Sequence, residues 1–345
     1  MLDDEVTIAV RNDSLILSVG EKLFQKHGHL EHLNSYISRK MRELDRLLIS
    51  ARHIDPDIQY LSDLLVPAKF PKVVIAATRV LCKYDENAKT NGNPSLAIKI
   101  GHLLKKCVRI ENSAALIAGD SERSKQANDF LDLIEDEWTD EVSCCALQTL
   151  KQNKMNKAQA LPLTEDIKKL QDHLQTLTNT SVPTLQREFS KSAFDLLNQV
   201  TLARLVLFNR RRGGETQRVS LEAYESKHNK DSTLKEVQES LSPVEKILCA
   251  TFSRIEIRGK KGRTVPVLII PELENCIDLL IHHRKSAGIH VENHFLFPRS
   301  NFDSRQPIRS TDVIRKFASE TGLSKPDNIT STNLRKHVAT VSQVL

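Results

Sequence analysis

The sequence gathers arginine side chains at the end of an apolar helix-like run. Residues 205–208 are apolar, and they lead into Arg210, Arg211 and Arg212, followed by two glycines and Glu215. Arginine binds phosphate oxygens through paired N–H groups, glycine allows close backbone approach, and Glu215 could hold one arginine from behind. The same run is also typical of a solvated basic helix end or of a nuclear import signal.

A second basic segment lies at the tip of a predicted β-hairpin. Residues 252–258 and 264–270 have strand character, and the turn between them contains Lys260 and Lys261, with Arg258 and Arg263 at its borders. A lysine on such a ribbon could reach a phosphate or a groove, or donate a proton to a leaving oxygen. An exposed, charged hairpin tip is the alternative interpretation.

A third segment places Arg335, Lys336 and His337 at the start of a predicted helix with apolar residues at Val338 and Val341. Taken alone, it is typical of a helix N-terminal turn with surface charges. The order of the three segments carries more information than any one of them.

In this order, the segments resemble the signature of the tyrosine recombinase (phage integrase) catalytic domain. That family has an arginine followed three residues later by glutamate, then a lysine in a hairpin that closes in Val-Pro, then a second arginine in a segment like Leu-Arg-Lys-His-Val-Ala-Thr, here 334–340. The resemblance covers about residues 161–345, and residues 161–170 are similar to the opening helix of that domain. It is closest in character to eukaryotic, Crypton-like or domesticated transposon-derived members.

The resemblance implies a role for each matching residue. Arg212 and Arg335 would clamp the scissile phosphate, Glu215 would support Arg212, and Lys260 would be the general acid, with Lys261 as a possible substitute. Contacts to the DNA backbone are expected from Arg210, Arg211, Lys261, Arg263, Lys336 and His337.

The sequence departs from the family pattern at three places. Thr332 stands where the family commonly has a histidine, and neither the family's further histidine or tryptophan nor its tyrosine follows Arg335. The four tyrosines, all upstream of it, are Tyr36, Tyr60, Tyr84 and Tyr224. We therefore expect a DNA integration and recombination type of protein without its own nucleophile, and whether it is an enzyme stays open. The apolar run ending at Leu345 indicates a truncated C-terminus, and another chain could donate a tyrosine in trans.

The pattern of apolar residues predicts a mainly α fold with a small antiparallel β-hairpin (α+β). We expect a helical, core-binding-like domain at 1–155 and an integrase-like catalytic domain at 156–345, joined through a polar linker near 151–163. Polar stretches are expected to be loops at 85–94 and 225–240, and Ser242 begins a helix. Helices are expected at 29–52, 71–81, from 95, from 121, at 140–150, 167–177, 182–210, 272–286, 310–321 and from 331.

Composition limits the classes of function. The chain has 345 residues, a net charge of +6 and 6 cysteines without metal-ligand spacing, and its positive charge is concentrated in the second half. We expect no metal, including at the histidine-rich stretch 27–32, no nucleotide or other cofactor, and no membrane association. The expected partner is double-stranded DNA, with a possible homo-oligomer on it, and the expected location is the nucleus if the protein is eukaryotic.

Two other hypotheses remain. The chain could be a catalytically dead, recombinase-derived helical module that binds proteins, or the three segments could coincide by chance in a basic helical protein. Separation of Arg212, Lys260 and Arg335 in space would favour chance, and convergence on one basic surface would count against it.

Overall fold

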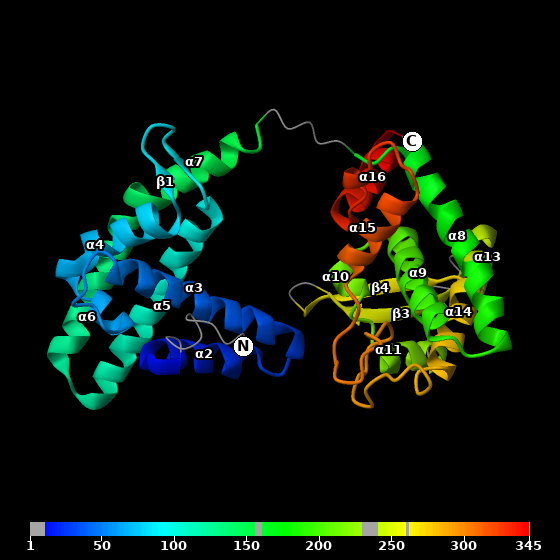
Figure 1. The fold of residues 1–345 in the computed structure, drawn as a ribbon, viewed down its shortest axis with the longest axis horizontal. Helices are drawn as coiled ribbons and strands as arrows, with labels where there is room; N and C mark the ends of the chain where they lie inside the picture. Colours follow the sequence, from blue (N-terminus) through cyan, green and yellow to red (C-terminus); the bar gives the residue numbers. More distant parts are fainter. Residues whose placement is uncertain (1–10, 156–160, 230–240, 260–261, 345) are drawn as a thin grey trace. The chain divides into compact units, whose positions relative to one another are not determined.

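The structure is a computed structural model that describes residues 11–155, 161–229, 241–259 and 262–344, with the backbone alone at 31, 228–229 and 341–344. The chain divides into two compact units, Met1–Ala158 and Gln159–Leu345. Both are mainly helical, as the sequence predicts, and the described residues contain two antiparallel strand pairs, of which the sequence predicts the second (Figure 1).

The first unit is built from helices around one apolar core. Asp13 begins its first described helix, because its carboxylate accepts hydrogen bonds from Ile16 N at 2.9 Å and from Leu61 N at 2.6 Å. Its α-helices and strands are α2 (Ser14–His27), α3 (Asn34–Arg52), α4 (Phe70–Ile75), β1 (Tyr84–Asp85), β2 (Thr90–Asn91), α5 (Pro94–Ala118), α6 (Ser121–Asp136) and α7 (Cys144–Gln152). Short 3-10 or π segments are Glu31–Leu33, Leu61–Leu64, Pro67–Lys69, Ala76–Leu81 and Thr139–Ser143.

Three expectations for this unit need correction. Helix α2 was not predicted, although its buried face contains Ile16, Val19 and Leu23. The predicted loop at 85–94 contains the hairpin β1–β2, in which Tyr84 pairs with Asn91. The helix expected at 71–81 changes from α to π geometry at residue 76, so it is two segments.

The second unit carries all three basic segments. Its α-helices and strands are α8 (Thr164–Arg187), α9 (Lys191–Asn209), α10 (Gly213–Thr216), α11 (Leu221–Glu225), α13 (Pro243–Thr251), β3 (Ser253–Arg258), β4 (Thr264–Ile269), α14 (Pro271–His282), α15 (Ser310–Glu320) and α16 (Ser331–Val344). Short 3-10 segments are Ser226–Asn229 and Pro326–Asn328. Figure 1 shows α8 and α9 running side by side, and α9 also packs against α14 and α15.

Helix α9 is the central helix of the second unit. Its buried residues include Leu197, Val200, Leu202 and Leu205, which point in different directions around the helix axis. A helix that is apolar on all sides is stable only when other elements cover it. The surrounding helices and the hairpin therefore take their positions from α9, and so does the arginine run at its end.

The helix boundaries differ from the prediction at one point in this unit. The sequence suggests a break near residue 180, but α8 continues through Pro183 to Arg187, and the break lies at Glu188–Ser190. Ser190 then caps α9, since its hydroxyl accepts a hydrogen bond from Ala193 N at 3.4 Å. The predicted loop at 225–240 contains the 3-10 segment Ser226–Asn229, and residues 230–240 lie outside the described part.

The other predicted elements agree with the structure. The hairpin has the expected strands, with Pro266 opposite Glu256, and Ser242 forms a capping box with Glu245. Helix α15 ends before Gly322, which adopts a positive φ of 64°. In the portion of the chain that the structure describes, no helix is both long and apolar enough to cross a membrane.

Two polar side chains attach other elements to the ends of the long helices. The amide of Asn209, the last residue of α9, donates to Leu268 O and accepts from Leu268 N, both at 2.8 Å, and so pairs with β4 as a strand would. The buried carboxylate of Asp166, in the first turn of α8, accepts from Ser324 N at 3.0 Å and Lys325 N at 3.1 Å. These bonds hold the hairpin at the end of α9, and hold the start of α8 beside the segment that leads to α16.

The Asn209 bonds predict a local effect on the hairpin. Asn209→Ala removes both bonds to Leu268, so the amides of β3 and β4 should exchange about tenfold faster in the full chain. Hydrogen exchange of peptides covering 253–269 measures this. Asn179→Ala, on the exposed face of α8, is the control and should leave the exchange of the hairpin unchanged.

Candidate phosphate-binding site

The site begins where α9 ends. Arg210 adopts the left-handed conformation, with φ 47° and ψ 35°, while its N–H still donates to Val206 O at 2.8 Å. A residue other than glycine rarely takes this conformation, and here it turns the chain sharply out of the helix. The turn places Arg212 at the start of the short helix α10.

Arg212 and Glu215 form an ion pair. Arg212 Nη1 lies 3.2 Å from Glu215 Oε1, and the arginine side chain is 50% exposed while the glutamate side chain is 6% exposed. The carboxylate therefore lies beneath the guanidinium and can fix its orientation, while half of the guanidinium side chain still faces solvent. This is the contact that the R-x-x-E spacing suggested.

Gly213 joins this turn to two helices that come much later in the sequence. A Cβ atom there would collide with Ser310 Oγ at the start of α15, and it would lie 3.3 Å from Ser331 Oγ at the start of α16. Only glycine leaves room for this approach. The approach brings the start of α16, which carries the third basic segment, next to the first segment.

His337 makes a direct contact between the same two segments. Its Nδ1 lies 3.0 Å from Arg210 Nη1, and its Nε2 lies 3.4 Å from Thr164 Oγ1 at the start of α8. The imidazole is 7% exposed. Burial, with the nearby Arg210 charge as the second cause, lowers the pKa of His337 below its ordinary value. His337 is therefore a buried connection between three elements, and its predicted contact with DNA stays a prediction.

Arg335 lies two residues before His337 on α16. It is partly buried, and no described residue forms a hydrogen bond or an ion pair with its guanidinium. Arg210 is also partly buried, and burial lowers its pKa. Among the described residues, its side chain contacts the imidazole of His337. Cations that are partly desolvated without a carboxylate partner are typical of sites that receive an anion.

The turn end of the hairpin reaches the same place. A Cβ atom on Gly259 would lie 3.4 Å from Glu215 Oε1, so the end of β3 approaches the acid that pairs with Arg212. Lys260 and Lys261, the predicted general acid and its substitute, lie outside the described residues. The structure therefore brings Arg210, Arg212, Glu215, the turn end of β3 at Gly259 and the start of α16 together.

The remaining predicted contact residues are on the surface. Arg211, Arg263 and Lys336 are all exposed, and Thr332, at the position where the family has a histidine, is exposed as well. Their contact with DNA stays a prediction.

Several residues of the site were not found from the sequence. The fold alone brings Thr164 to His337 and Ser310 to Gly213, and Arg218 lies over Gly214, with its Nη1 3.5 Å from where a Cβ would be. The opening helix that was predicted near 161–170 places Thr164, but no pattern in the sequence indicated its contact with His337. The Arg309-Ser310 pair before a predicted helix was a usable signal for a helix start.

A basic hollow lies beside the site. It has a volume of about 310 Å³, and Arg299, Arg309 and Lys316 are its basic lining residues, together with Asp312 and Gln199. Lys316 Nζ lies 2.9 Å from Gln199 Oε1, and no carboxylate within the described residues pairs with any of the three cations. Because Arg309 directly precedes Ser310, which contacts Gly213, the hollow lies next to the turn that carries Arg212.

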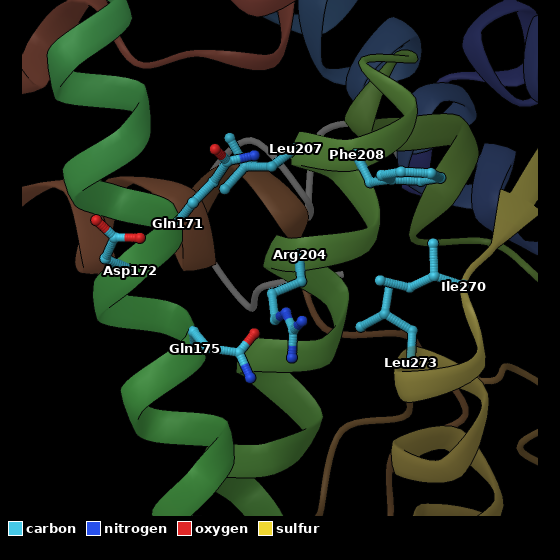
Figure 2. A pocket seen from close by; sticks show the side chains of 8 residues that line it. All are labelled: Gln171, Asp172, Gln175, Arg204, Leu207, Phe208, Ile270 and Leu273. Carbon is cyan, nitrogen blue, oxygen red and sulfur yellow. The ribbon is translucent and has the colours of Figure 1, made fainter.

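Another pocket in the second unit is explained by an ion pair inside it. It has a volume of about 230 Å³ between α8, α9 and α14, and Figure 2 shows Arg204 and Gln175 pointing toward one another inside it. Arg204 forms two bonds with Glu272, at 3.0 and 2.8 Å, and Gln175 donates to the same carboxylate. The bonds to Arg204 and Gln175 lower the pKa of Glu272. This pocket contains a satisfied ion pair and none of the predicted site residues.

The second unit contains one tyrosine, Tyr224, and it does not resemble a nucleophile. Its side chain is buried, its hydroxyl donates to Asp278 Oδ1 at 2.6 Å, and the Lys227 ammonium lies 3.8 Å from the ring centroid. Burial, followed by the hydrogen bond to Asp278, raises the pKa of Tyr224 far above its usual value. A tyrosine in this state is a poor source of phenolate.

Comparisons with other proteins leave the family open. No protein-family model matches this chain, and neither a curated protein nor a solved structure matches it. A search of the described residues for groups of histidine, cysteine, aspartate and glutamate that could hold a metal ion also finds none. The resemblance to tyrosine recombinases therefore stays a prediction from the sequence.

The crowding at Gly213 gives a testable difference between adjacent glycines. Gly213→Ala should lower the thermal unfolding midpoint of the full chain by several degrees, because the new methyl group collides with the buried Ser310. Gly214→Ala is the matched control, since a Cβ there meets only Arg218 Nη1 at 3.5 Å. Circular dichroism at a helical wavelength measures both. Equal midpoints for the two variants would contradict the packing described here.

Proposed function

We propose that this chain binds double-stranded DNA as a tyrosine-recombinase-like protein, with Arg212 and Arg335 holding a backbone phosphate. One observation supports this most strongly. Segments more than a hundred residues apart meet at one place, through the Arg210–His337 contact at 3.0 Å and the approach of Gly213 to Ser331. Chance basic segments in a helical protein have no reason to converge in this way.

The charge of the site agrees with an anionic ligand. Arg210, Arg212 and Arg335 lie on two adjoining segments, and Arg212 pairs with Glu215, whose carboxylate is buried beneath it. A phosphate would supply the negative charge that the partly buried guanidinium of Arg335 lacks. Arginine suits this task because its guanidinium can donate two parallel hydrogen bonds to phosphate oxygens.

Catalysis of strand cleavage is a further part of the same proposal. Two arginines on the phosphate would stabilise the charge that develops during phosphoryl transfer, and Lys260 would protonate the leaving oxygen. Because Tyr224 is buried and bonded to Asp278, the nucleophilic tyrosine would come from another chain or from another part of the protein. A homo-oligomer on DNA in the nucleus fits this arrangement.

DNA affinity and its dependence on salt test the proposal. A fluorescein-labelled duplex of about 30 base pairs is titrated with the full chain by fluorescence anisotropy at several potassium chloride concentrations. We expect tight binding at low salt, with a negative slope of log affinity against log salt. Arg212→Ala and Arg335→Ala should each weaken binding about tenfold or more and make the slope about one unit shallower.

Arg187→Ala is the matched control for charge. Arg187 ends α8 and is exposed, and Thr164, which contacts His337, begins the same helix about 35 Å away at the usual rise per residue. This variant should bind DNA within about twofold of the unchanged protein. No binding at low salt, or equal losses for Arg187→Ala and Arg335→Ala, would make the proposal wrong.

The adjacent basic hollow allows an independent test, which concerns the path of the DNA on the protein. A strand held at Arg212 would pass Arg309 next, so the double variant Arg309→Ala/Lys316→Ala should make the salt slope about two units shallower. Arg315→Ala is the control, since Arg315 is exposed on α15 but does not line the hollow. If Arg315→Ala changed the salt slope by as much per positive charge removed, only the overall charge of the protein would matter.

A second candidate function is contact with another protein. All nine residues of α13 are exposed, and among them Val244 and Ile247 are each 65% exposed. Such a face is typical of a surface that another molecule covers. This function is compatible with DNA binding, and it becomes the leading one if the chain does not bind DNA at low salt.

A further inference from the structure

The protonation state of His337 follows from its neighbours. Arg210 Nη1 carries only N–H groups and cannot accept a hydrogen bond, so at 3.0 Å His337 Nδ1 must be the acceptor. Nδ1 is therefore unprotonated, and the ring proton of the neutral imidazole is on Nε2. From there it points at Thr164 Oγ1, which can accept it at 3.4 Å. The contacts thus select one tautomer of a neutral imidazole.

Protonation of His337 would reverse its contact with Arg210. A proton on Nδ1 would place two donors and two positive charges 3.0 Å apart, in a place where the imidazole is 7% exposed. The two groups would then have to separate. The charged group that acts on His337 from α9 is Arg210. From α8, the nearby carboxylate of Asp166 is held by Ser324 N and Lys325 N, and on α16 itself the neighbouring cations are Arg335 and Lys336.

The consequence extends to the whole site. Arg210 sets the left-handed turn that carries Arg212, and His337 is on the same helix as Arg335, two residues away. The Arg210–His337 bond is thus the side-chain link between the two segments that supply the two proposed phosphate ligands. If the link opens, the separation of Arg212 and Arg335 is no longer fixed by this bond.

We propose that His337 is a positioning residue that acts through Arg210. It fixes the separation of the two phosphate-binding arginines, Arg212 and Arg335, only while its imidazole is neutral. The proposal rests on the proposed function and adds regulation to it: DNA affinity depends on one buried proton. His337 does not contact the DNA. It keeps α16 against the end of α9, with Thr164 fixing the ring from the other side.

The sign of the pH dependence distinguishes this role from simple electrostatics. Burial and Arg210 lower the pKa of His337, so the neutral form is present at neutral pH and is lost as the pH falls through that lowered value. We expect DNA affinity to fall in the same range. Protonation of an exposed histidine has the opposite effect, because added positive charge strengthens binding to DNA.

The experiment compares the unchanged chain with His337→Asn between pH 8 and pH 5 at constant ionic strength. Asparagine can place an acceptor oxygen near the position of Nδ1, but it does not titrate. At pH 8 the two proteins should bind the labelled duplex within about twofold. At pH 5 the unchanged chain should bind more weakly than His337→Asn by about tenfold or more, as expected for the loss of a hydrogen bond to a charged group. Circular dichroism at each pH establishes that both remain folded.

A second variant and a spectroscopic measurement test the same link. His337→Lys imitates the protonated state, so it should bind DNA more weakly than the unchanged chain at pH 8 although it adds a positive charge. Nitrogen-15 NMR of the unchanged chain should show His337 with an unprotonated Nδ1 and a protonated Nε2 at neutral pH. Tighter binding by His337→Lys, a protonated Nδ1, or the same pH profile for the unchanged chain and His337→Asn would each overturn the proposal.

These outcomes are separate from those that test DNA binding itself. If the unchanged chain binds the duplex with a normal salt slope but its pH profile matches that of His337→Asn, the positioning role fails and the proposed function stands. If the chain does not bind the duplex at pH 8 and low salt, the proposed function fails first.

Discussion

The second unit depends on how its central helix ends. Helix α9 is buried over most of its length, and at its end Asn209 pairs with β4 while Arg210 turns the chain in the left-handed conformation. One helix end therefore positions the hairpin through Asn209 and α16 through Arg210. The proposed phosphate ligands lie on the two segments that this helix end brings together. A small change of backbone direction at Arg210 would separate them.

This arrangement places positive charge where it contributes little to the stability of the fold. Partly burying a guanidinium without a carboxylate partner costs free energy, and a neutral imidazole compensates less than an acid would. Arg335 lacks a partner among the described residues, and Arg210 has the imidazole of His337. By contrast, Arg204 in the same unit is matched by Glu272 with two hydrogen bonds. The difference between Arg204 and Arg335 separates a cation that supports the fold from one that is available to a ligand.

The sequence predicts the elements better than it predicts their contacts. The alternation in 253–269 and the capping box at Ser242 gave correct elements, because both depend on local spacing. The break between α8 and α9 was misplaced, since packing allows α8 to continue through Pro183. The R-x-x-E spacing suggested the Arg212–Glu215 pair, which lies within one turn. The bonds of His337 with Arg210 and Thr164 join residues 127 and 173 positions apart, and only the three-dimensional packing brings these together.

The position of the single tryptophan has a practical consequence for spectroscopy. Trp138 is 4% exposed in the apolar core of the first unit, and the second unit contains no tryptophan. Fluorescence excited at wavelengths that tryptophan absorbs and tyrosine does not therefore reports on the first unit alone. Far-ultraviolet circular dichroism reports on both units. Unfolding curves from the two signals would coincide if the units melt together and would separate if each has its own cooperative transition. The protein thus carries a natural probe for the independence of its two halves.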